Sequence, residues 1–149
     1  MQTDPTPVRA GPLDDSTDFG QFLHDFYALR RSIRSQRRDV WHPPTDVYET
    51  DDEIVIKMSI PGVKQPNVAV EVRGEQVTIY GMRRAPDHSR VRAYHQMEIR
   101  NGYFERIIVL RKPFDPSRAR ASLQDGFLHV YIPKAPELVR HTLRIKLNG

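Results

Sequence analysis

Residues 121–134, ASLQDGFLHVYIPK, decide the fold. From position 127 onward, apolar and more polar side chains alternate, and the purely aliphatic positions are Leu128, Val130 and Ile132. A period of two predicts a β-strand with one face on a core and the other nearer to solvent. The Asp125-Gly126 dipeptide supplies the positive φ angles that a tight hairpin requires. This stretch therefore indicates a β-domain.

The same period of two appears in three earlier segments, with alternating apolar residues at Ile54, Ile56, Met58 and Ile60, at Val68, Val70 and Val72, and at Val77 and Ile79. Turn dipeptides separate the segments: Asp51-Asp52, Pro61-Gly62, Gly74-Glu75 and Asn101-Gly102. Seven or eight short strands with turn signals this close together predict an all-β protein with a β-sandwich. No helical pattern of ten residues lies between them, which argues against an α/β fold.

The region before the strands has a different pattern. From Phe19 to Ile33, apolar residues recur at spacings of three and four, which predicts an amphipathic helix. His42-Pro43-Pro44 cannot continue a helix. We therefore divide the chain into an N-terminal arm (1–43), flexible and then helical, a β-sandwich domain (44–134) and a C-terminal extension (135–149).

Two further segments look like strands that lack a partner. Residues 83–97 form a polar loop, rich in arginine, that ends in a short strand near 91–97. An edge strand needs a partner, so we expect this arm to pair with another subunit. Residues 143–147, LRIKL, alternate apolar and basic side chains and predict a short strand without a local partner.

Composition and motifs exclude most catalytic classes. The 149 residues contain no cysteine, so disulfides, thiolate metal sites and cysteine nucleophiles are absent. No phosphate-binding glycine loop and no nucleophile elbow is present, and the six histidines show no paired ligand spacing. We expect no enzyme, no cofactor and no metal. Without a signal peptide or an apolar membrane span, a cytoplasmic protein is expected.

One basic cluster leaves nucleic-acid binding open as an alternative. Five arginines stand within Arg30–Arg38, close to Tyr27 and Trp41. Arginine binds phosphate and aromatic rings stack on bases. The competing interpretation, which we favour, is the solvated C-terminal end of an amphipathic helix. We therefore expect neither a nucleic-acid partner nor a membrane partner.

The β-region, from about Pro44 to Leu147, resembles the α-crystallin domain of small heat-shock proteins. Five segments carry the resemblance in the family's order: 44–49 (PTDVYE), 60–72 (IPGV followed by VAVEV), 102–106 (GYFER), 121–128 (ASLQDGFL) and 132–134 (IPK). The fourth is the most specific, because it keeps the pattern of alanine, four residues, glycine, an apolar residue and leucine.

The resemblance implies an immunoglobulin-like sandwich that dimerises through the arm before Asn101-Gly102. In bacterial and plant members this arm adds its strand to the neighbour's sheet. The implied dimer-interface residues are Tyr94, His95, Met97 and Arg106. In the tail, Ile145 and Leu147 stand where the family has two apolar side chains that plug a groove of another dimer.

Three positions depart from the family pattern. The leucine-proline after the arginine strand is here Leu110-Arg111, with a proline only at Pro113, so the turn is expected to be built differently. Phe127 replaces the usual valine and adds bulk near the groove. Leu147 replaces a β-branched residue, which is expected to weaken docking of the tail.

The function implied is that of an ATP-independent chaperone that holds partly unfolded clients. The expected partners are a second copy of the chain in dimers and larger homo-oligomers, unfolding clients, and ATP-dependent chaperones downstream. The predicted client-binding residues are Phe19, Phe22, Leu23, Phe26 and Trp41. The alternative from another class is a scaffold domain that docks on a larger chaperone.

Overall fold

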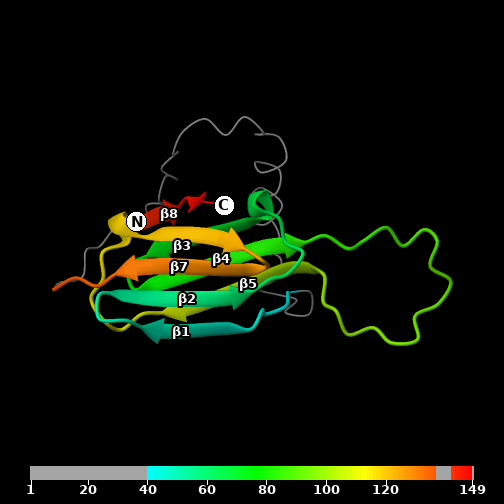
Figure 1. Ribbon diagram of the computed structural model, residues 1–149, viewed down its shortest axis with the longest axis horizontal. Helices are drawn as coiled ribbons and strands as arrows, with labels where there is room; N and C mark the ends of the chain where they lie inside the picture. Colours follow the sequence, from blue (N-terminus) through cyan, green and yellow to red (C-terminus); the bar gives the residue numbers. More distant parts are fainter. Residues whose placement is uncertain (1–39, 137–141, 149) are drawn as a thin grey trace, which may run out of the picture.

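The computed structural model describes residues 40–136 and 142–148, and they form two β-sheets that face each other (Figure 1). In the described residues, the strands are β1 (Thr45–Glu49), β2 (Glu53–Ser59), β3 (Val68–Arg73), β4 (Gln76–Arg83), β5 (Gly102–Val109), β6 (Arg120–Gln124), β7 (Phe127–Pro133), β8 (Thr142–Ile145) and β9 (Leu147–Asn148). Two short 3-10 turns, η1 (Gln65–Asn67) and η2 (Pro116–Arg118), complete the elements.

The first sheet has the strand order β1-β2-β7-β6-β9, and the second has the order β5-β4-β3-β8. All neighbours pair antiparallel except β6 and β9, which run parallel. β1 and β5 are therefore edge strands of their sheets. At the opposite edges stand β8 and β9, both formed by the C-terminal extension.

The core lies between the sheets and is built by the alternating positions. Completely buried side chains come from both sheets, among them Ile56, Met58, Val70, Ile79, Phe104, Leu128 and Ile132. Phe114 joins them from the segment that leads from β5 to β6. These are the positions that the period of two places on the inner face, so the predicted all-β sandwich is confirmed.

The hairpin between β6 and β7 confirms the prediction made from the deciding stretch. Asp125 and Gly126 have φ angles of 51° and 80°, as the two central residues of a type I′ turn require. Gln124 consequently stands opposite Phe127, which sets the register of the whole β6–β7 pair. The turn thereby places Leu128 toward the core.

A glycine permits close packing in the middle of β4. A Cβ atom built on Gly81 would lie 2.3 Å from the backbone oxygen of Asn67 and 2.5 Å from a ring carbon of Phe104. Only a residue without a side chain lets η1 and the Phe104 ring approach β4 this closely. This contact seats the largest inner-facing side chain of β5.

Three predictions are wrong for the single chain. Asn101-Gly102 is no hairpin turn, because β4 ends at residue 83 and β5 begins at residue 102, although Gly102 has a φ of 90°. Residues 91–97 form no strand, because an extended segment without a neighbouring strand has no ladder to join. Residues 143–147 have local partners after all, since they pair with β3 and β6.

The boundaries drawn at residues 43/44 and 134/135 stay a prediction. The expected helix of residues 19–33 lies outside the described residues.

The segment after β5 differs from a tight turn, as the departure at Leu110-Arg111 predicted. Leu110 is buried, its N–H bonds to the carbonyl of Glu75, and Phe114 bridges to Lys134 before the chain enters η2.

Candidate functional site

The tail closes one side of the sandwich. Ile145 stands opposite Val70 in the β3–β8 pair, and Leu147 stands opposite Ala121 in the β6–β9 pair. The two side chains are only 6% and 9% exposed and belong to the core cluster. The tail therefore bridges the two sheets and fills the apolar opening between them, within the same chain.

Polar contacts fix the tail in register. The side-chain amide of Gln65 donates a hydrogen bond of 2.7 Å to the carbonyl of Leu147. Arg144 stands directly opposite Glu71, and its Nη2 donates to the hydroxyl of Tyr80 at 3.3 Å. Lys146 is exposed. Basic side chains thus point out of the groove while the apolar ones enter it, and opposite charges face each other across β3 and β8.

The family departure at Leu147 is compatible with docking. Its side chain is buried, although it lacks the β-branch that the family has at this position. Phe127, the other departure near the groove, is 37% exposed, and the ammonium group of Lys57 lies 4.5 Å from its ring centroid. The added bulk of Phe127 is therefore at the surface.

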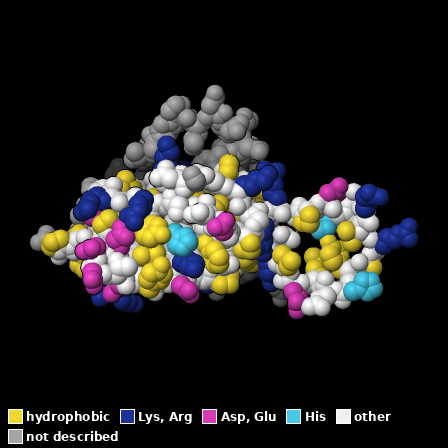
Figure 2. Space-filling view, in the orientation of Figure 1, with side chains coloured by type: hydrophobic (Ala, Val, Ile, Leu, Met, Phe, Trp, Pro, Cys, Tyr) yellow, Lys and Arg dark blue, Asp and Glu magenta, His cyan; other side chains and the backbone are white. Residues whose placement is uncertain are grey.

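The arm between β4 and β5 protrudes from the sandwich as a long loop (Figure 1). Hydrophobic and basic side chains lie together on it (Figure 2). Met97 and Ile99 are 69% and 73% exposed, and Tyr94 is half exposed. Apolar side chains this exposed on an isolated loop lack the partner surface that would bury them.

Local contacts at the tip shape the arm. Asp87 accepts hydrogen bonds from the backbone and the side chain of Ser89, and the backbone bond lowers the pKa of Asp87 most. The hydroxyl of Tyr94 contacts Nδ1 of His88, and the two rings meet edge to face. The predicted interface residue His95 is exposed. The tip is therefore a folded turn.

The opposite side of the sandwich, between β1 and β5, stays open. Among the described residues β1 pairs with β2 alone, and β5 pairs in a ladder with β4 alone. Arg106 shares the inward side of β5 with Phe104 and Ile108, and its side chain is partly exposed there. Because β5 is an edge strand, Arg106 lies on a strand that borders the open side.

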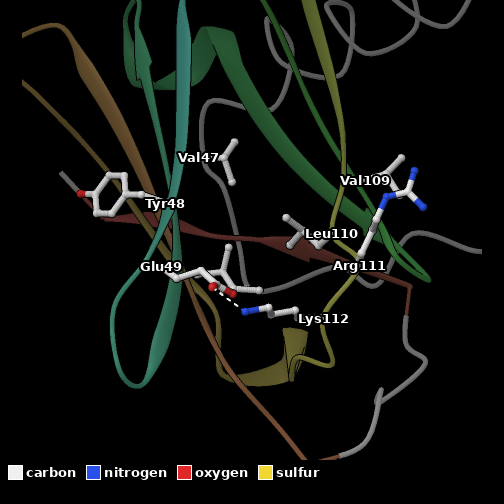
Figure 3. A pocket seen from close by; sticks show the side chains of 8 residues that line it. Val47, Tyr48, Glu49, Val109, Leu110, Arg111 and Lys112 are labelled. Carbon is white, nitrogen blue, oxygen red and sulfur yellow. Dashed lines mark hydrogen bonds and ion pairs between the residues drawn. The ribbon is translucent and has the colours of Figure 1, made fainter.

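A shallow hollow lies on this side of the sandwich, where β1 meets the end of β5 and the segment after it (Figure 3). Its lining is Val47, Tyr48, Glu49, Ile54, Val109, Leu110, Arg111 and Lys112. Lys112 Nζ lies 2.8 Å from Glu49 Oε2, and Lys134 lies 3.9 Å from the other carboxylate oxygen. The hydrogen bond from Lys112 lowers the pKa of Glu49. Edge strand β1 is thus held against the other sheet.

Trp41 is buried where a client-binding residue was predicted to be available. It is 8% exposed, and its ring meets Phe104 edge to face at a centroid distance of 5.5 Å. Its backbone bonds to Tyr103 and Glu105 of β5. A client can touch Trp41 only after this segment leaves the domain. The other predicted client-binding residues, Phe19, Phe22, Leu23 and Phe26, and the Arg30–Arg38 cluster, lie outside the described residues.

Several residues that build these sites were not predicted. Gln65 carries no signal in the sequence, because a glutamine in a turn has many uses. Arg144 is visible only as a basic residue beside an apolar one. Arg83 was grouped with the arm's other arginines, yet its guanidinium group contacts three separate segments. Such roles depend on the packing of side chains that lie far apart in sequence.

Among residues 40–136 and 142–148, no three acidic or histidine side chains lie close enough together to hold a metal ion. No helix in that part of the chain is long and apolar enough to cross a membrane.

The fold and the site define a class: an immunoglobulin-like sandwich with a strand-like arm on one side and an apolar tail docked on the other. The chain belongs to the Hsp20/alpha crystallin family, whose sequence profile matches residues 46–148. It is therefore a small heat-shock protein. The members of this family are non-enzymatic chaperones.

Individual relatives agree with this assignment. Small heat shock protein C2 of Rickettsia felis is 27% identical over 95% of this chain and 88% of its own length. The 18.1 kDa class I heat shock protein of Arabidopsis thaliana is 31% identical over 70% of this chain and 65% of its own. The solved structure of hspA from Xanthomonas axonopodis superposes with a TM-score of 0.60 at 26% identity, covering 65% of this chain and 97% of that one.

Proposed function

We propose that this chain is an ATP-independent holdase that captures partly unfolded proteins as a homo-oligomer built from dimers. The observation that carries the proposal is the pair of strand-like appendages on one sandwich. One of them, the tail, is docked in a groove, and the other, the arm, carries exposed apolar side chains. Binding the unfolded state needs no nucleotide, because mass action alone withdraws unfolded chains from aggregation.

The dimer is proposed to form at the open side. The extended arm of one subunit would add its strand to the free edge of β1 in the other, burying Met97 and Ile99. The predicted interface residues Tyr94, His95 and Arg106 lie on the arm or at this open side. Replacing Arg106 with Gln is expected to weaken the dimer, because an acidic or carbonyl partner across the interface loses its charge-assisted bond. An unaltered dimer mass and melting temperature would count against this role.

Client binding is proposed to reside in the aromatic segment that holds Phe19, Phe22, Leu23 and Phe26, with Trp41 joining only when it is released. Clients and downstream ATP-dependent chaperones stay predictions, as does the cytoplasmic location.

The test is light scattering of a client enzyme that aggregates on heating, with and without the full chain and in the absence of ATP. We expect suppression at equimolar to several-fold excess. A Phe22→Ser, Phe26→Ser variant is expected to lose most of the suppression. The matched control is Ile107→Ser, which removes a half-exposed apolar side chain from the sandwich itself. No suppression by the unmodified chain refutes the holdase, and a monomeric mass would favour the scaffold alternative.

A further inference from the structure

Arg83 closes the neck of the arm. It is the last residue of β4, and its Nε donates a hydrogen bond of 2.9 Å to the carbonyl of Arg100, at the arm's returning end. Its Nη2 donates to the same carbonyl. Nη1 donates to the carbonyl of Pro61 at 3.2 Å, in the turn after β2. One guanidinium group thus ties both roots of the arm to the body of the sandwich.

The same guanidinium group stacks on Trp41. Its central carbon lies 4.2 Å from the ring centroid. The indole Nε1 of Trp41 in turn donates 3.2 Å to the carbonyl of Gly102, two residues beyond the carbonyl that Arg83 holds. Arg83 and Trp41 therefore hydrogen-bond to carbonyls two residues apart, where the arm returns to β5, and the guanidinium group stacks on the indole ring.

The two contacts depend on each other for a physical reason. An arginine keeps its charge at all ordinary pH values. A partly buried guanidinium group therefore needs protein contacts in place of the hydrogen bonds to water that it loses. Burial lowers the pKa of Arg83, and the carbonyls and the Trp41 ring supply the compensating contacts. If Trp41 leaves, one face of the guanidinium group opens to water. Its bonds to Arg100 then compete with solvent.

We infer that Arg83 is a positioning residue that couples the seat of Trp41 to the root of the arm. The inference rests on the proposed function, in which the arm forms the dimer. Seating of Trp41 fixes the direction in which the arm leaves the sandwich, and its release frees the arm. By reciprocity, a partner that holds the arm stabilises the seat of Trp41.

A spectroscopic measurement tests the contact itself. Trp41 is the sole tryptophan, so its fluorescence reports this site alone. Replacing Arg83 with Met is expected to shift the emission and increase quenching by acrylamide. Arg118→Met makes the same change at an exposed position of η2, outside the arm, and is expected to leave the emission unchanged. Emission of Arg83→Met identical to that of the unmodified chain overturns the inference.

Subunit exchange tests the coupling. Isotope-labelled and unlabelled full-length chains are mixed, and the appearance of mixed dimers is followed by native mass spectrometry. We expect Arg83→Met and Trp41→Leu each to accelerate exchange by about tenfold, the size of losing one charge-assisted hydrogen bond. The double variant should exceed neither single variant appreciably, because both remove one shared arrangement. Arg118→Met should exchange at the unmodified rate.

The outcomes separate the coupling from the dimer. Unmodified chains that are monomeric overturn the arm-mediated dimer, and this inference with it. Dimers in which the two changes multiply to about a hundredfold overturn the coupling alone. Arg83→Lys guards against misfolding. It keeps the charge and one carbonyl bond but lacks the planar fork, so its exchange rate should fall between the unmodified chain and Arg83→Met. An exchange rate equal to that of Arg83→Met also supports the inference and shows that the planar guanidinium group, rather than the charge alone, positions the arm. A rate equal to that of the unmodified chain overturns the inference.

Discussion

Truncating the tail's two apolar side chains should release it from the groove. The perturbation is Ile145→Ala together with Leu147→Ala. Each change removes three carbon atoms from a side chain that is less than a tenth exposed. At ~0.8 kcal/mol per buried methylene, each loss amounts to about 2.4 kcal/mol, and the pair to about 5 kcal/mol. The ratio of docked to released tails should therefore fall on the order of a thousandfold.

Hydrogen exchange followed by mass spectrometry measures this release directly. Peptides covering β3 and β6 should exchange faster in the variant, since each strand loses its neighbour from the tail. The mass of the oligomer, measured by size exclusion with light scattering, should fall toward that of dimers. The matched control is Lys146→Ala, because Lys146 is exposed between the two truncated residues.

The result that would refute the reasoning is unchanged protection of β3 and β6 together with an unchanged mass. Dilution adds a second criterion, which separates docking within one chain from docking on another. Protection that persists on dilution indicates the arrangement of this structure, where the tail pairs with its own β3. Protection that is lost on dilution indicates exchange of tails between subunits, because only that contact depends on concentration.

Three further predictions concern stability and the dimer. Gly81→Ala has no room for its methyl group and should lower the free energy of unfolding by about 3 kcal/mol or more, whereas Gly74→Ala, with open space but a φ of 58°, should cost only about 1 kcal/mol; equal melting temperatures would contradict the close approach. The hydrogen bond from Arg120 lowers the pKa of Glu53, so its stabilisation is present above the ordinary value of 4.5 and is lost as pH falls through the lowered pKa; thermal melts of Glu53→Gln should be lower than those of the unmodified chain near neutral pH and converge with them in acid, and a constant difference would count against the ion pair. Met97→Asp places a charge on the proposed arm interface and should shift the mass from dimer to monomer, and an unchanged mass would exclude Met97 from that interface.

The strands of the sandwich could be predicted because their pattern is local. In β7 the period of two and the Asp125-Gly126 turn agree, so a single reading of the sequence locates both the strand and its register partner. The same holds for β2 and β3. Their inner faces need no knowledge of the partner strand, since any apolar layer opposite them satisfies the pattern.

The arm and the tail were harder because their structure depends on what lies beside them. Residues 91–97 have the composition of a strand but form none in the single chain, where no free edge reaches them. The tail has the same alternating character and does form strands, because β3 and β6 present free edges within reach. Periodicity describes which face is apolar, and it contains no information about which edge is available.

Arg83 illustrates a further limit. Its neighbours in sequence suggest one more solvated arginine of a polar loop. Its role arises from the Pro61 turn, the returning root at Arg100 and the ring of Trp41, which only the folded chain brings together. No pattern of residue types within one sequence marks such a convergence.

The edges of the two sheets explain why this sandwich is built to associate. Each sheet of such a fold has two edges, and an unpaired edge attracts other strands. On one side the tail covers both edges, with β8 along β3 and β9 along β6. On the other side no strand of the described residues continues either sheet, although the Trp41 segment bonds to part of β5, and the exposed arm emerges from the end of β4. The first side is paired within one chain, whereas the second has free strand edges that the proposed dimer would cover. Release of the tail would leave the edges of β3 and β6 unpaired as well, so a chain with a released tail would present free strand edges on both sides of the sandwich.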